Sequence, residues 1–130
     1  MNLQSQRGRA ILVQLLVLAC FAASFAFVMP PASYIGLAIG VAALAIASSN
    51  RMDGMPWART HHEHALRTII IGAAAWTLLS LLMFLQMPAL APIVFWGRVI
   101  IVVWAGARAL IGLGLAIFRR PIPNPRGPLI

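Results

Sequence analysis

The chain has 130 residues, of which 62% are hydrophobic and only 9% are charged, and its formal net charge is +8. A soluble domain usually carries about 25% charged residues, and a chain this short could not hide so many apolar side chains from water in one core. The composition therefore excludes an ordinary soluble domain. It indicates an all-α membrane protein, because helices satisfy their own backbone hydrogen bonds in lipid.

Four apolar stretches are each close to the length, about 20 residues, that crosses a bilayer core as a helix. Pro30-Pro31 ends the first stretch, Ser33 is a suitable N-cap for the second, and Pro92 precedes the fourth. We expect a single membrane domain, 1–130, in which about four transmembrane helices pack as a small bundle. The predicted helices cover residues 10–29, 33–49, 65–87 and 93–118, with a cytoplasmic loop over 50–64 and an extended tail over 119–130.

The basic residues predict the orientation of this bundle. All ten are arginines, and eight of them lie before the first stretch, around the central loop or in the tail, whereas the two short turns carry none. Because basic residues stay on the cytoplasmic side, we expect both termini in the cytoplasm. Arginine without lysine is typical of a GC-rich bacterial genome, so the expected location is the bacterial inner membrane. An alternative is that the short second stretch and the first form one re-entrant hairpin.

Small residues form one face of the second predicted helix, at Gly36, Gly40, Ala43 and Ala47. The absence of bulky side chains lets another helix approach closely. The face therefore predicts close packing, either within the chain or in a dimer.

The polar residues His61, His62, Glu63 and His64 precede the third stretch. Imidazole binds metals, but His61 and His64 supply only two ligands on one helical face, so they are weak metal candidates and we expect no cofactor. The favoured interpretation is a polar juxtamembrane turn. The single cysteine, Cys20, is interpreted as a small apolar residue in the membrane, with lipid attachment as the alternative.

Arg108 lies eleven residues before Arg119, about 16 Å along a helix, and therefore near the predicted midplane. Intramembrane charges are functional candidates by default. Three interpretations stay open: Arg108 extends to the headgroups, it binds carbonyls at the break between the first two helices, or the membrane part ends near it. In the third case Arg98 is the buried arginine. Trp104, four residues earlier, is placed to stack on Arg108.

No nucleophile–base pair, phosphate-binding glycine loop or pair of carboxylates is present, so we expect no enzyme. The absence of an acid within an apolar stretch argues against proton-coupled transport. The arginines sit at the ends of apolar runs and form no stripe with interleaved aromatics, so nucleic acid is not an expected partner. The expected partners are the lipid bilayer and other membrane proteins or a second copy.

From the central loop onward the chain carries a spaced set of polar, aromatic, glycine and proline residues: His61, Arg67-Thr68, Trp104, Arg108, Gly112, Pro121 and Asn124-Pro125. On these residues the chain resembles a family of small uncharacterised bacterial membrane proteins, a domain of unknown function distantly similar to the chloroplast inner-envelope import component. The resemblance covers about residues 34–125. It departs at Ile69-Ile70 and in the additional His62 and His64. It implies a compact helical membrane protein without an established activity.

These observations predict a non-enzymatic inner-membrane protein that acts by helix packing as an accessory or assembly subunit of a larger complex. The alternative is a small oligomeric channel or transporter in which Arg108 faces a pore and selects anions. Metal sensing at His61 and His64 is a third hypothesis. The candidates for a lipid or partner contact are Arg108, Trp104, Arg98, His61 and Arg67.

Overall fold

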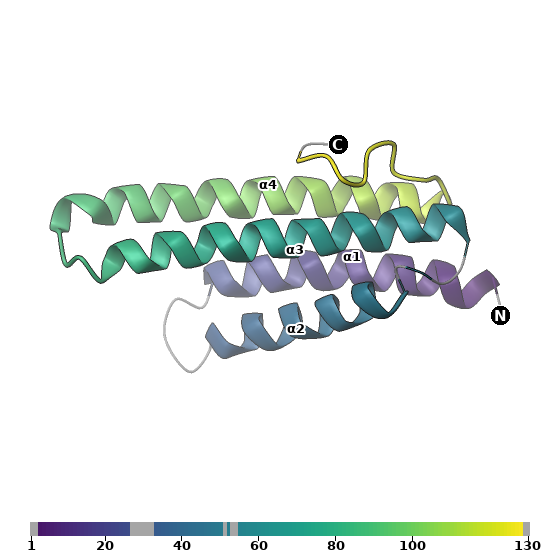
Figure 1. Cartoon of the computed structure of the whole chain (residues 1–130), viewed down its shortest axis with the longest axis horizontal. Coiled ribbons are helices and arrows are strands. Elements are labelled where there is room, and N and C mark those ends of the chain that lie inside the picture. Colours follow the sequence, from purple (N-terminus) through teal and green to yellow (C-terminus); the bar gives the residue numbers. More distant parts are fainter. Residues whose placement is uncertain (1–2, 27–32, 51, 53–54, 129–130) are drawn as a thin grey trace.

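The computed structural model describes residues 3–26, 33–50, 52 and 55–128, and within them the protein is all-helical. Its four α-helices are α1 (Leu3–Ala26), α2 (Ser33–Asn50), α3 (Pro56–Met83) and α4 (Ala91–Ile117), and a short 3-10 helix, η1 (Pro88–Leu90), precedes α4. They form an elongated bundle in which α1 packs against the other three helices (Figure 1). The described start of α1, the tail after α4, the end of α2 and the start of α3 lie at the same end of the bundle. We call this the terminal end.

Buried residues recur every three or four positions along each helix, which is the spacing of one helical face. On α1 the fully buried apolar positions include Ala10, Val13 and Val17, and on α4 they include Ala105 and Ala109. Large apolar side chains on the opposite faces are exposed. Alanine supplies many of the buried positions while large apolar residues cover the outside, which fits a bundle surrounded by lipid.

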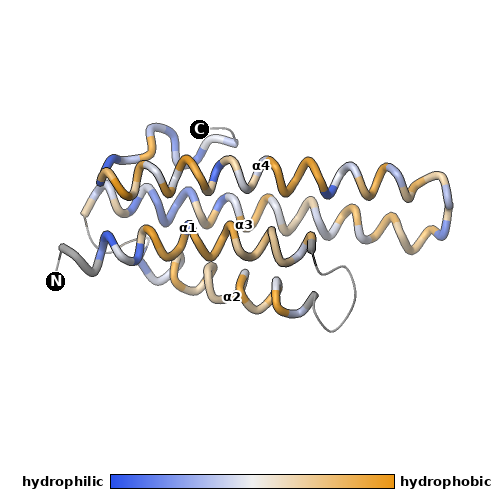
Figure 2. The backbone as a smooth tube through the Cα atoms, turned by 180° about the vertical axis from the view of Figure 1, so that it is seen from behind, coloured by the Kyte–Doolittle hydropathy of each residue, from blue (hydrophilic) through white to orange (hydrophobic). Residues whose placement is uncertain are grey.

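Three helices are long and apolar enough to cross a membrane: residues 6–25, 56–83 and 88–117. The apolar part of α2, Tyr34–Asn50, is shorter. With 18 residues against 28 for α3, α2 is about 27 Å long and α3 about 42 Å. The α3–α4 hairpin consequently extends beyond α1 and α2 at the far end (Figure 1), and hydrophilic residues gather towards the terminal end (Figure 2).

The third helix differs most from its predicted range of 65–87. It begins at Pro56, because proline fits the first turn, where its missing N–H has no intrahelical partner. It ends at Met83, and Gln86 then takes a left-handed φ of 52° in the turn before η1. The helix therefore includes the histidines that the sequence placed in a polar loop.

The other ranges shift less. α1 begins at Leu3 instead of residue 10, whereas α2 and α4 lie within two residues of their predicted bounds. The break at Pro30-Pro31 lies outside the described residues. Over its described residues the tail contains no helix or strand, but it is not extended throughout, since the Gly127 amide donates to the Asn124 carbonyl at 3.1 Å in a turn. The tail also does not stand apart from the bundle. It begins at Arg119, whose φ of 54° ends the helix, and it runs back along α3 and α4 (Figure 1).

Candidate functional site

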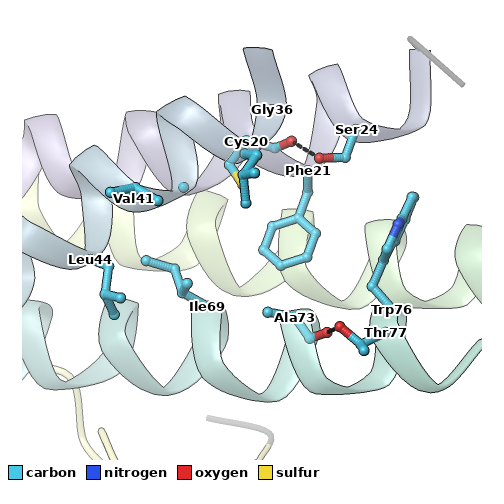
Figure 3. A pocket seen from close by; sticks show the side chains of 12 residues that line it. Cys20, Phe21, Ser24, Gly36, Val41, Leu44, Ile69, Ala73, Trp76 and Thr77 are labelled. Carbon is cyan, nitrogen blue, oxygen red and sulfur yellow. Dashed lines mark hydrogen bonds between the residues drawn. The ribbon is translucent and has the colours of Figure 1, made fainter. Parts of the chain in front are cut away.

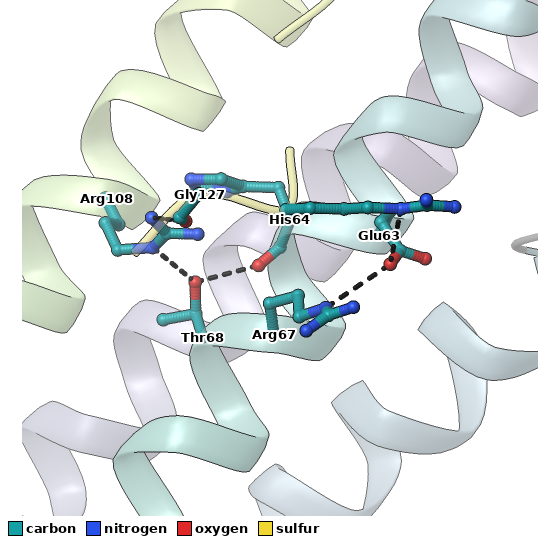
Figure 4. A network of polar contacts seen from close by, with 7 residues as sticks. Glu63, His64, Arg67, Thr68, Arg108 and Gly127 are labelled. Atoms are coloured by element: carbon teal, nitrogen blue, oxygen red, sulfur yellow. Dashed lines mark hydrogen bonds and ion pairs between the residues drawn. The ribbon is translucent and has the colours of Figure 1, made fainter. Parts of the chain in front are cut away.

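Arg108 is the centre of a buried polar cluster between α3, α4 and the tail. Its side chain is 2% exposed. Its Nε donates a hydrogen bond to the Thr68 hydroxyl at 3.0 Å, and its Nη1 donates to the Gly127 carbonyl at 2.8 Å. Thr68 in turn donates to the His64 carbonyl at 2.8 Å, so α4, α3 and the tail are joined by one chain of hydrogen bonds (Figure 4).

Trp104 completes the surroundings of the guanidinium. The Arg108 carbon Cζ lies 5.3 Å from the centre of the indole ring, within the range of a cation–π contact. The indole Nε1 donates to the Pro128 carbonyl at 2.9 Å. Both residues therefore bind the tail, and the stacking expected from their four-residue spacing is present.

The surroundings of Arg108 bear on its three interpretations. The residue is interior and does not extend to the bundle surface. It does bind a carbonyl, but that carbonyl belongs to Gly127, and the break between the first two helices lies outside the described residues. α4 continues unbroken through Arg108 to Ile117.

The histidines are also interior. His61, His62 and His64 are 0%, 2% and 1% exposed, so they do not form a solvated juxtamembrane turn. His61 Nε2 donates to the Arg120 carbonyl at 2.9 Å, and its ring meets the edge of Trp57 at 5.8 Å between centroids. The tail covers part of this face of α3, since the Arg120 carbonyl lies on the His61 ring.

The tail is attached at further points. The Ile122 amide donates to the Thr60 hydroxyl at 3.0 Å, and the Ile122 side chain is 2% exposed. Arg126 lies 3.7 Å from the Glu63 carboxylate, which also contacts Arg67 at 3.4 Å. Arg67 itself is half-exposed on the outer face of α3. These exposed ion pairs contribute little individually, so the buried contacts of Arg108, His61 and Ile122 are the main attachment.

Gln14 is a member of the cluster that the sequence did not single out. It is 1% exposed, and its side-chain amide donates to the His61 carbonyl at 3.2 Å. A Cβ at Gly112 would lie 2.7 Å from the Gln14 amide carbon. The signal was a lone glutamine within an apolar stretch, opposite a glycine on another helix.

Arg98 occupies a separate, partly buried position towards the far end of the hairpin. Its Nη2 donates to the Ser80 hydroxyl at 3.2 Å, and its Cζ lies 5.0 Å from the Trp76 ring centre. Arg98 thus joins α4 to α3, as Arg108 does, with a hydroxyl and an indole from neighbouring turns. Within the bundle Arg108 is more deeply buried than Arg98.

The small face of α2 packs on α1. Gly36, Gly40, Ala43 and Ala47 are all buried, and a Cβ at Gly40 would lie 2.9 Å from the Cys20 sulfur. Cys20 is a free, partly buried cysteine. The close approach therefore occurs within the chain, and these four residues are covered by α1.

A cavity of about 330 Å³ opens between α2 and α3, with α1 as its floor (Figure 3). Apolar side chains form most of its wall. Its hydroxyl groups, on Ser24 and Thr77, donate to carbonyls of their own helices, at 2.7 and 2.8 Å. Arg108 and the histidines do not line it. Among the described residues there is also no group of three or more His, Cys, Asp or Glu side chains that could hold a metal ion.

No family model, curated protein or solved structure matches the chain. The resemblance to the uncharacterised membrane family therefore stays a prediction. Five of the residues that carry it nevertheless lie close together: His61, Thr68, Trp104 and Arg108 lie in the cluster beneath the tail, and Gly112 lies against Gln14 in the same cluster.

Proposed function

We propose that the chain is a non-enzymatic, multi-pass protein of the bacterial inner membrane that acts as an accessory or assembly subunit of a larger membrane complex. The observation that supports this most is how its polar side chains are used. Arg108, Thr68 and His61 bind other parts of the same chain, whereas the surface away from the terminal end exposes mainly large apolar side chains. A protein built in this way interacts through packing of its outer helix faces.

The hairpin of α3 and α4 is the best candidate for the contact with a partner. It is longer than the α1–α2 pair, and large apolar residues are exposed along it, including Leu78, Phe95, Trp96 and Ile100, which are 54–67% exposed. Lipid covers such a face equally well, so the surface supports membrane embedding first and partner binding second.

The cavity gives no support for catalysis. It contains Cys20, Ser24 and Thr77 but no histidine or carboxylate that could serve as a general base. The rival hypothesis, an anion channel, requires Arg108 to face an aqueous path. Its 2% exposure and its bonds to Thr68 and Gly127 favour a packing role instead.

The decisive experiment is purification in mild detergent at near-native abundance. We expect the 14.0 kDa chain to migrate with a larger complex, and we expect the double variant Trp96→Ala/Ile100→Ala to leave that complex while remaining folded. Leu37→Ala, at an exposed position on α2, is the control and should stay bound. Migration as a homo-oligomer, with an anion conductance that disappears in Arg108→Ala, would instead establish the channel. Migration as a lone monomer contradicts both.

A further inference from the structure

The cavity between α2 and α3 is chemically unlike the polar cluster. Its floor is formed by Cys20 and Phe21 of α1, and its outer rim is formed by Val41 and Leu44 of α2 opposite Ala73 of α3 (Figure 3). Since Ser24 and Thr77 are already bonded to backbone carbonyls, the cavity offers little to a polar ligand. The cavity is therefore suited to a hydrocarbon ligand.

The cavity opens onto an apolar outer surface of the bundle. Leu37 and Val41 on its rim are 63% and 58% exposed, and α3, which forms the opposite wall, is one of the helices apolar enough to cross the membrane. Its 330 Å³ lie at the lower end of ligand-pocket volumes, about 300–1,000 Å³. An α-helix with side chains is about 10–12 Å across, so a partner helix would cover the opening without filling it. A single flexible chain could fill it.

Charge at the terminal end of the same wall points to the headgroup that such a chain carries. Arg59 precedes Thr77 by 18 residues, which is five full turns, so both lie on one face of α3. Arg59 is about 15 Å from Ile69, where the cavity begins, and one leaflet with its headgroups is about 20 Å thick. A phosphate beside Arg59 would therefore place its acyl chain at the cavity. Arg9, bonded to Asn50 at the end of α2, adds positive charge at this end.

We propose that this cavity is a binding site for one acyl chain of an anionic phospholipid, whose phosphate is held near Arg59. The apolar walls, the opening towards lipid and the arginine on the same helix face each point to this occupant. The site is independent of the partner contact proposed above, since it lies on the α2–α3 side.

The test uses the full chain in vesicles of phosphatidylethanolamine and phosphatidylglycerol that contain a trace of phosphatidylglycerol with a photoreactive diazirine on its acyl chain. After irradiation, adducts mapped by mass spectrometry should concentrate on residues 37–44 and 69–77. In Ala73→Phe, which fills the cavity, labelling of these segments should fall at least about tenfold, because excluding a few methylene groups changes affinity by such a factor. Ala74→Phe, at an exposed neighbour outside the cavity, should label like the unmodified chain.

Adducts spread evenly over the exposed faces of all four helices, or equal labelling in Ala73→Phe and Ala74→Phe, would overturn the chain site. The headgroup is tested with the same diazirine on phosphatidylcholine, which should label the site less than phosphatidylglycerol. Arg59→Gln should abolish this preference, and Arg67→Gln, on a different face of α3, should keep it. Equal labelling by the two lipids in the unmodified chain would overturn the role of Arg59.

Discussion

Burying the Arg108 guanidinium costs free energy, but its contacts have a clear structural role. Removing a guanidinium from water is expensive even when partners are present, and an apolar residue of similar size is often equally stable. The contacts with Thr68, Gly127 and Trp104 offset this cost, and those with Thr68 and Gly127 connect α4 to α3 and to the tail. We infer that Arg108 stabilises the position of the tail more than it stabilises the helices.

Replacing Arg108 by methionine separates these two roles. We expect the tail over residues 119–128 to open at least about tenfold more often, because a hydrogen bond to a charged group contributes about 1.5–3 kcal/mol. The thermal midpoint of the helices should stay equal or rise, since methionine fills the space without a buried charge. Hydrogen exchange of the tail measures its opening, and circular dichroism during thermal unfolding measures the midpoint of the helices. Arg67→Met, at a half-exposed arginine, should change neither, and a tail that stays protected in Arg108→Met would contradict this role.

Thr68 tests the same cluster from α3. Thr68→Val keeps the shape of the side chain but removes the hydroxyl that accepts from Arg108 and donates to the His64 carbonyl. A buried donor left without its acceptor costs about 1–3 kcal/mol, so the free energy of unfolding should fall by about that amount.

The matched control is Thr77→Val, whose hydroxyl is exposed and bonds only to the Ala73 carbonyl of its own helix. Surface changes of this kind usually stay within about 0.5 kcal/mol. Denaturant titration in detergent distinguishes the two variants. Equal losses at Thr68 and Thr77 would mean that the Arg108 contact adds nothing to stability.

At the scale of the helices, two glycines of α4 make a matched pair. Gly112 faces Gln14 so closely that an added Cβ would lie 2.7–2.8 Å from three atoms of its amide, whereas Gly114 has nothing within 4 Å. Overpacking a core typically costs about 1–3 kcal/mol. In an open helical position, alanine is favoured over glycine by about 0.5–1 kcal/mol.

We therefore expect opposite signs from the same substitution. Gly112→Ala should lower the thermal midpoint of the bundle, and Gly114→Ala should raise it slightly. Gln14→Ala combined with Gly112→Ala should recover part of the loss, because the space occupied by the amide becomes available. A Gly112→Ala midpoint at or above that of the unmodified chain would show that Gln14 moves aside without cost.

The helices themselves were largely predictable, because an apolar stretch bounded by prolines has few alternatives in lipid. The start of α3 could not be predicted in this way. Its first turns contain Arg59, His61 and Glu63, and this polar composition is typical of a loop until the burial of one face is known. The covering element is the tail, whose four prolines predict an extended chain but not its direction. The partner of Arg108 could not be predicted either, because Gly127 contributes its backbone carbonyl, and every residue has such a group.

At the scale of the whole molecule, the positions of the arginines fit the electrostatics of the helix ends. The arginines near the chain ends lie at the terminal end, and two of them meet the ends of helices: Arg7 donates to the Ile117 carbonyl at 2.9 Å, and Arg9 to the Asn50 side chain at 2.6 Å. A cation at a helix C-terminus is favourable because it meets the negative end of the helix dipole. The turn at the far end, around Gln86 and Met87, carries no charged residue.

This asymmetry predicts that the terminal end faces the cytoplasm and that α1 and α2 cross the membrane, or enter it and return, as a pair. Single cysteines introduced into a Cys20→Ser chain test both statements. Met87→Cys, in the far turn, should react with an impermeant maleimide added to intact spheroplasts. Gly8→Cys and Pro123→Cys should react only after the membrane is permeabilised. Opposite accessibility of Gly8→Cys and Pro123→Cys would require an odd number of crossings. Such a result is incompatible with this bundle, because the first turns of α1 and the tail lie at one end of it (Figure 1).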